Sequence, residues 1–184
     1  MANVVMALAT AAALPTLSAQ ASKPTVVILV RHAEKAAEPA NDPPLTTAGE
    51  ARAKELLAAV KDAGVSAIIT TQVVRTKATA APAAQALNLV PEILAASNDP
   101  NNARVVADAI RKHAGETMLV VGHSNTVPLI IAALGAKEPA PICDASYDNL
   151  YIVTIGGDGH AGVVHARYGA RTPDDQGCLS IMKK

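Results

Sequence analysis

The sequence predicts an α/β fold in which helices cover both faces of a largely parallel sheet. Strand-like and helix-like segments alternate along the chain, a pattern typical of parallel strands joined by crossover helices. The first strand-like segment, 25–30, is a continuous apolar run, as expected for a strand buried on both faces. The chain has 184 residues, 50% of them apolar, with no repeat or linker. We therefore expect one domain over residues 22–184, built as a three-layer α/β/α sandwich.

The expected elements follow from local patterns. The helix expected over 47–64 begins with Thr47 and Glu50 at capping-box spacing. Pro82 either kinks the helix expected over 74–87 or begins a new one. The remaining segments are read from apolar runs, helical periodicity and the glycines that end them. We expect further strands over 65–71, 89–94, 117–121, 149–155 and 163–168, and further helices over 102–114 and 127–134.

The first 21 residues are similar to a signal peptide. An uncharged apolar stretch over 4–14 precedes the A-x-A pattern at 19–21 and is too short to cross a bilayer. We expect residues 1–21 to be removed and the mature protein to be periplasmic or secreted, without membrane association. The alternative is a cytoplasmic protein with an N-terminal helix. In an exported protein, Cys143 and Cys178 would form a disulfide; otherwise they are two unpaired thiols.

The composition argues against several classes of partner. The 16 basic and 16 acidic residues cancel, so no polyanion partner is indicated. Three tyrosines are the only large aromatic residues, and single-stranded nucleic acid needs more stacking surfaces. The cysteines and histidines lack metal-site spacing. We therefore expect no nucleic-acid partner, metal ion or cofactor.

Cationic and histidine side chains follow three of the expected strands. Arg31 and His32 come directly after the first strand, and His123 follows the strand over 117–121. Arg75 lies at the start of the helix after the strand over 65–71. The carboxyl ends of parallel strands meet at one edge of a sheet, so these side chains should share a pocket. Because guanidinium groups suit phosphate oxygens, we predict a phosphate pocket with His32 as candidate nucleophile.

The same residues resemble the motifs of the histidine phosphatase superfamily, also called the phosphoglycerate mutase-like family. The family's Arg-His opening resembles Arg31-His32, and its Gly-His resembles Gly122-His123. Its Leu-Thr-x-x-Gly segment resembles residues 45–49, and its Arg-Thr-x-x-Thr-Ala segment resembles residues 75–80. The four segments occur in the family's order. Ala33 stands where the opening motif commonly has Gly.

The resemblance implies a phosphoglycerate mutase-like fold and a place in the small single-domain phosphatase branch. It implies that His32 is the nucleophile and forms a phosphohistidine. It also implies that Arg31, Arg75 and His123 bind the phosphoryl oxygens, where charge develops during transfer. No metal ion is needed, because the arginines supply the positive charge.

The proton donor for the leaving group stays open. Phosphoglycerate mutases carry a Glu after the third strand, and acid phosphatases carry an Asp after the second His. Here Ser124 follows His123 instead. The candidates are Glu34, Asp99 and Glu92, or none of these. Without an acid, a good leaving group or a phosphoramidate would still react, since it needs less proton donation.

We predict a metal-independent phosphatase that hydrolyses small phosphomonoesters, with inorganic phosphate or vanadate as ligands of its pocket. One alternative is a non-catalytic module that binds phosphate or a phosphorylated ligand. A second is a phosphatase of phosphohistidine proteins. A phosphoglycerate mutase is the least favoured, because this short chain has little material with which to exclude water from the pocket.

Overall fold

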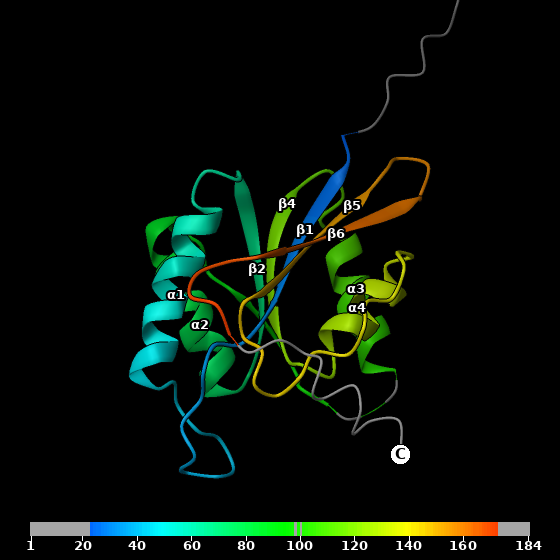
Figure 1. Ribbon diagram of the computed structural model, residues 1–184. Helices are drawn as coiled ribbons and strands as arrows, with labels where there is room; N and C mark the ends of the chain where they lie inside the picture. Colours follow the sequence, from blue (N-terminus) through cyan, green and yellow to red (C-terminus); the bar gives the residue numbers. More distant parts are fainter. Residues whose placement is uncertain (1–22, 98, 100, 173–184) are drawn as a thin grey trace, which may run out of the picture.

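The computed structural model describes residues 23–97, 99 and 101–172, and these form a six-stranded sheet with helices on both faces (Figure 1). This arrangement confirms the predicted three-layer α/β/α sandwich. The strands are β1 (Thr25–Arg31), β2 (Val65–Thr71), β3 (Glu92–Leu94), β4 (Thr117–Gly122), β5 (Asn149–Ile155) and β6 (Ala161–Arg167). The helices are α1 (Thr47–Val60), α2 (Val74–Ala86), α3 (Asn102–Arg111) and α4 (Val127–Ala133).

The strand order in the sheet is β3-β2-β4-β1-β5-β6. β3, β2, β4 and β1 are mutually parallel, and β5 and β6 complete the sheet as an antiparallel pair. Arg31 pairs with Gly122, and Thr70 pairs with Val121. The ends of β1, β4 and β2 are therefore level, so the residues that follow them emerge at the same edge.

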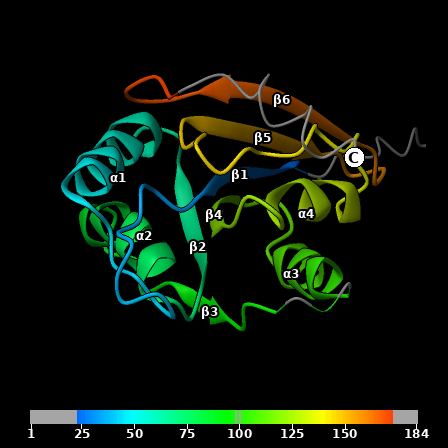
Figure 2. The ribbon, with the colours of Figure 1, turned by 60° about the horizontal axis from the view of Figure 1, so that its bottom comes forward.

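Two apolar cores lie on the two faces of the sheet. α1 and α2 cover one face, and α3 and α4 cover the other (Figures 1 and 2). Val27 and Leu29 of β1 belong to the core beneath α3 and α4, whereas Ile28 and Val30 belong to the core beneath α1 and α2. The continuous apolar run of β1 is thus explained, since each of its faces is buried.

The cap of α1 differs from the prediction. The N-cap is Thr46 rather than Thr47, and its hydroxyl accepts a hydrogen bond from Gly49 N at 3.1 Å. The Thr46 N–H donates to the carbonyl of Glu34, so α1 begins where the chain returns to the end of β1. This tertiary contact selects Thr46 over its neighbour.

Other boundaries also differ by a few residues. β3 begins at Glu92 rather than at 89, since Val90 is almost fully exposed before this short edge strand. α2 is one helix that contains Pro82, so no second helix begins there. Proline removes one helical N–H, a loss that a helix packed along its length can tolerate. α3 and α4 end at Arg111 and Ala133, before 114 and 134, and β6 spans 161–167.

Some predictions fall outside the described residues. These are the signal peptide over 1–21 and Cys178, so export and the bridge to the buried Cys143 stay predictions. Within residues 23–97, 99 and 101–172, no helix is long and apolar enough to cross a bilayer.

Candidate active site

The two histidines of the predicted pocket lie together at the carboxyl edge of the sheet. His32 follows β1 and His123 follows β4, and their ring centroids are 5.5 Å apart. The His32 N–H donates to the carbonyl of Gly122 at 2.9 Å, which extends the pairing of β1 and β4 by one residue. Both residues are buried, at 4% and 9% exposure. The strand register therefore places the two rings in contact.

The His32 ring is held by the backbone of the next residue. Its Nδ1 lies 2.8 Å from the carbonyl oxygen of Ala33. A carbonyl can only accept, so Nδ1 carries the proton and Nε2 keeps its lone pair. Ala33 N donates to Thr79 Oγ1 at 2.9 Å, and the Thr79 hydroxyl donates to the Arg75 carbonyl at 2.7 Å. This chain of hydrogen bonds joins the orientation of His32 to the first turns of α2.

Both histidines are neutral at physiological pH. Burial lowers the pKa of His32 to about 3, and the positive charges of Arg31 and Arg75 add to this effect. Burial also lowers the pKa of His123 to about 4, again with a contribution from the two arginines. An imidazole attacks only in its neutral form, so His32 is in the reactive state when the pocket is empty.

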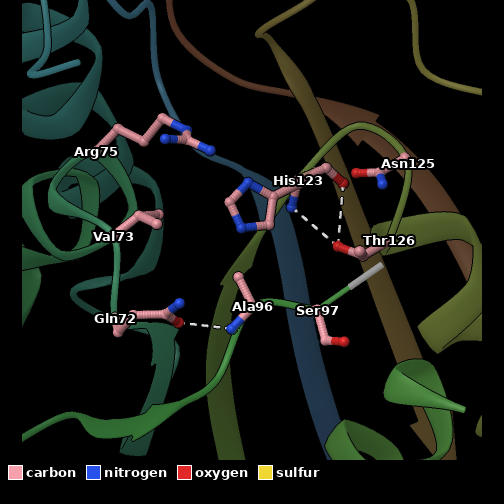
Figure 3. Close-up of a pocket in the computed structure, with 8 residues that line it drawn as sticks. All are labelled: Gln72, Val73, Arg75, Ala96, Ser97, His123, Asn125 and Thr126. Atoms are coloured by element: carbon pink, nitrogen blue, oxygen red, sulfur yellow. Dashed lines mark hydrogen bonds between the residues drawn. The ribbon is translucent and has the colours of Figure 1, made fainter. Parts of the chain in front are cut away.

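Arg75 and His123 line one pocket of about 290 Å³ (Figure 3). The other lining residues are small or polar: Gln72, Val73, Ala96, Ser97, Asn125 and Thr126. His123 Nε2 lies 3.2 Å from Thr71 Oγ1, which fixes the ring against the end of β2. Arg75 thus supplies the positive charge on one side of the pocket, and the remaining lining is neutral, partly polar and partly apolar.

Arg31 is fixed by the turn that precedes β5. Its Nη1 donates to three carbonyls, those of Cys143, Asp144 and Ser146, at 2.7, 3.0 and 3.1 Å. The guanidinium lies over the Tyr147 ring, 4.1 Å from its centroid. Its Nη2 is 3.6 Å from a carboxylate oxygen of Asp144. Arg31 therefore holds this turn beside His32, whose ring lies 6.2 Å from that of Tyr147.

The carboxylate of Glu34, the candidate acid close to the nucleophile in sequence, is bound by Arg52. Both carboxylate oxygens accept from Arg52 Nε, at 2.9 and 3.0 Å, and Arg52 Nη2 adds an ion pair at 2.8 Å. Arg52 is 3% exposed and also donates to the carbonyls of Tyr168 and Ala170. Glu34 therefore neutralises a buried cation, a role that proximity in sequence to His32 did not reveal.

The other two candidate acids lie in different places. Glu92 faces His113 at 3.7 Å, and His113 precedes β4, at the opposite edge of the sheet from the pocket. Asp99 belongs to the loop whose Ala96 and Ser97 line the pocket. The Asp99 carboxylate accepts from Asn101 N at 2.7 Å. Of the three candidates, Asp99 alone is on a segment that lines the pocket.

Several residues around the pocket were not predicted. Thr79 belongs to the Arg-Thr-x-x-Thr-Ala segment at 75–80, yet the hydrogen bond that it accepts from Ala33 N could not be inferred from the spacing of that motif. Tyr147 offered a signal, because it is one of three aromatic residues in the chain. Thr71, Asp42 and Asp144 reach the site through tertiary contacts with His123, Arg75 and Arg31, for which the sequence carries no pattern.

A family model supports the motif assignment. The model of the histidine phosphatase superfamily (branch 1) matches residues 27–98, a range that includes His32 and Arg75. Among curated protein sequences, none matches this chain.

Solved structures share the fold at low sequence identity. One is phosphoserine phosphatase from Entamoeba histolytica in complex with 3-phosphoglyceric acid, with a TM-score of 0.59, 16% identity, and coverage of 79% of this chain and 97% of that one. The protein histidine phosphatase SixA complexed with tungstate has a TM-score of 0.56 and 16% identity, with coverage of 80% of this chain and 96% of that one. A mycobacterial glucosyl-3-phosphoglycerate phosphatase has a TM-score of 0.59 and 12% identity, with coverage of 80% of this chain and 100% of that one. The chain has the histidine phosphatase fold, and the resemblance seen in its motifs is confirmed.

Proposed function

We propose that this protein is a phosphatase that hydrolyses phosphomonoesters through a phosphohistidine on His32. The observation that carries the proposal is the state of the His32 ring. The ring is buried and neutral, and its Nδ1 proton is bound by the Ala33 carbonyl, so the Nε2 lone pair is available for attack. The adjacent His123 and the cationic side of the pocket supply the complementary site for a phosphoryl group.

The reaction would proceed in two displacements. In the first, His32 Nε2 forms a bond to phosphorus while the bond from phosphorus to the leaving oxygen breaks, and that oxygen takes up a proton. In the second, a water oxygen attacks phosphorus, the P–N bond breaks, the water's proton is released, and inorganic phosphate leaves. Arg75 and His123 would donate hydrogen bonds to the phosphoryl oxygens during both steps, with Arg31 adding positive charge nearby. In this proposal the positive charge that stabilises the phosphoryl oxygens comes from the two arginines, so the reaction would not require a metal ion.

We infer that Asp99 protonates the leaving group. Its loop contributes two residues to the pocket wall, whereas the Glu34 carboxylate is bound to Arg52 and the Glu92 carboxylate faces His113. Asp99→Asn should lower kcat/KM about 100-fold for alkyl phosphates and much less for 4-nitrophenyl phosphate, whose leaving group needs little protonation. Glu34→Gln is the matched control and should not change the dependence on the leaving group. Equal losses on both substrates would argue against Asp99 as the acid.

A phosphoramidate such as phosphohistidine is the second candidate substrate. No carboxylate is among the described residues that line the pocket, and a phosphoramidate needs less assistance from a carboxylic acid. If this reading is correct, a phosphohistidine peptide should be dephosphorylated at the same rate by the wild type and Asp99→Asn. A rate that falls with Asp99→Asn, as for alkyl phosphates, would favour the phosphomonoester.

The decisive experiment traps the intermediate. Wild-type protein should release phosphate from 4-nitrophenyl phosphate and, when quenched during turnover, should carry an acid-labile, base-stable phosphoryl group. His32→Ala should show neither, while its circular dichroism spectrum confirms that it is folded. Tight vanadate binding by the wild type without turnover would instead support the non-catalytic binding module. Turnover that persists in His32→Ala would rule out the phosphohistidine.

A further inference from the structure

Asp42 connects the loop between β1 and α1 to the wall of the pocket. Its two carboxylate oxygens accept from the backbone N–H of Val74, at 3.0 and 3.2 Å, although 32 residues separate them. Val74 is the first residue of α2, the helix that carries Arg75. The contact therefore joins the residue 36–44 loop to the point where α2 enters the site.

The contact replaces a cap that α2 lacks. The N-cap position is occupied by Val73, which has no side-chain oxygen and makes no capping bond. The first N–H groups of a helix need external acceptors, and a carboxylate suits them because the helix N-terminus is partially positive. Asp42 is thus a capping residue supplied by a distant part of the chain.

The same carboxylate faces Arg75. One Asp42 oxygen lies 3.6 Å from Arg75 Nη1, and the two side chains are 35% and 18% exposed. Within the described part of the chain, Asp42 is the acidic partner of this guanidinium, and the buried Arg75 Nε has no hydrogen-bond partner. Asp42 therefore contacts Arg75 directly while also fixing the start of its helix.

We propose that Asp42 is a positioning residue that holds Arg75 toward the pocket and, as its counter-charge, sets how tightly the pocket binds phosphate. The proposal rests on the proposed function, because it assigns Arg75 to phosphate binding. A bound phosphate and the Asp42 carboxylate are both negative and share one guanidinium. Their repulsion acts over several ångströms in a partly exposed site, so it lowers phosphate affinity without preventing binding.

Two substitutions separate the charge from the cap. Asp42→Asn removes the charge but keeps an oxygen that can accept from Val74 N. Asp42→Ala removes both. Asp62→Asn is the control for net charge, because Asp62 is 84% exposed, pairs with Lys61 and lies beyond the end of α1.

The first measurement is the Kd of inorganic phosphate by titration calorimetry at low ionic strength. Asp42→Asn should bind phosphate about fivefold more tightly than the wild type, and the gain should shrink as salt is added. Asp42→Ala should lose that gain, because Arg75 is no longer held, and Asp62→Asn should match the wild type. An unchanged Kd in Asp42→Asn would overturn the counter-charge role. Equal tightening in Asp42→Asn and Asp42→Ala would overturn the positioning role.

The second measurement does not depend on phosphate binding. Amide hydrogen exchange at Val74 should be slow in the wild type and in Asp42→Asn, and clearly faster in Asp42→Ala. Unchanged exchange in Asp42→Ala would overturn the structural connection itself. Val74 exchange could respond as expected although neither the wild type nor any variant binds phosphate. In that case the proposed function fails, and the counter-charge role of Asp42 fails with it, whereas the role of Asp42 as the cap of α2 is retained.

Discussion

Replacing His32 with asparagine should make the protein less sensitive to unfolding by acid. In the folded state, burial and neighbouring cations keep the pKa of His32 at about 3 and that of His123 at about 4, against an ordinary value of 6.5. The unfolded chain binds these protons near pH 6.5, and the folded chain does not until pH 3–4. Acid therefore favours unfolding throughout that window.

The size of the effect follows from the two pKa shifts. Below pH 6.5, each histidine that stays neutral in the folded state costs about 1.4 kcal/mol of stability per pH unit. Between pH 7.5 and 5.5 this amounts to about 1.4 kcal/mol for each residue, or about 3 kcal/mol for the pair. His32 is not among the causes of the low pKa of His123, so that shift should survive the substitution. Between pH 7.5 and 5.5, His32→Asn should therefore lose about 1.4 kcal/mol of unfolding free energy, whereas the wild type should lose about 3 kcal/mol.

The assay is urea unfolding followed by circular dichroism at pH 7.5, 6.5 and 5.5, without phosphate in the buffer. His160→Asn is the control, because the His160 side chain is 91% exposed and His160 is not among the causes of either low pKa, so the contribution of the two buried histidines should remain. Phosphate should restore part of the stability lost at pH 5.5, since an anion in the pocket favours protonated histidines. If His32→Asn loses as much stability as the wild type between pH 7.5 and 5.5, the buried, neutral state of His32 is refuted.

Two further substitutions test how the motifs build the site. A Cβ on Gly49 would lie 2.2 Å from the Glu34 carbonyl oxygen, so Gly49→Ala should cost about 3 kcal/mol in urea unfolding. Gly162→Ala, which meets nothing within 4 Å, should cost less than about 1 kcal/mol, and similar losses at both sites would contradict the steric reason. Thr79→Val should leave Ala33 N unpaired, at a cost of about 2 kcal/mol, and should lower kcat more than it raises KM. A change in KM alone would show that Thr79 does not act through the position of His32.

The fold could be predicted because its signals are local. The apolar run of β1 indicates burial on both faces, and the alternation of strands and helices indicates a parallel sheet. Boundaries were less certain, because the choice of Thr46 as the cap of α1 depends on a contact with Glu34 from another part of the chain. The short β3 likewise begins only at Glu92, after the exposed Val90.

Two of the residues that line the pocket, Arg75 and His123, were named from the sequence, and the buried His32 lies beside His123. His32 and His123 directly follow β1 and β4, whose carboxyl ends are level in the parallel part of the sheet, so the two histidines meet because of the topology. The partner of the His32 ring was not predictable, although the Ala33 carbonyl is only one residue away, because the ring could rotate toward several acceptors.

By itself the sequence determined the layers of the fold and the edge of the sheet at which His32 and His123 meet. The tertiary structure alone decided which carboxylates remain available. Glu34 is adjacent to the nucleophile in sequence, yet the buried Arg52 binds it, whereas Asp42 reaches Arg75 from a loop that no motif marks. The physical reason is that a buried charge needs an oppositely charged or polar partner within a few ångströms. The packing of the whole fold determines which side chain lies there, and the neighbouring residues in sequence do not.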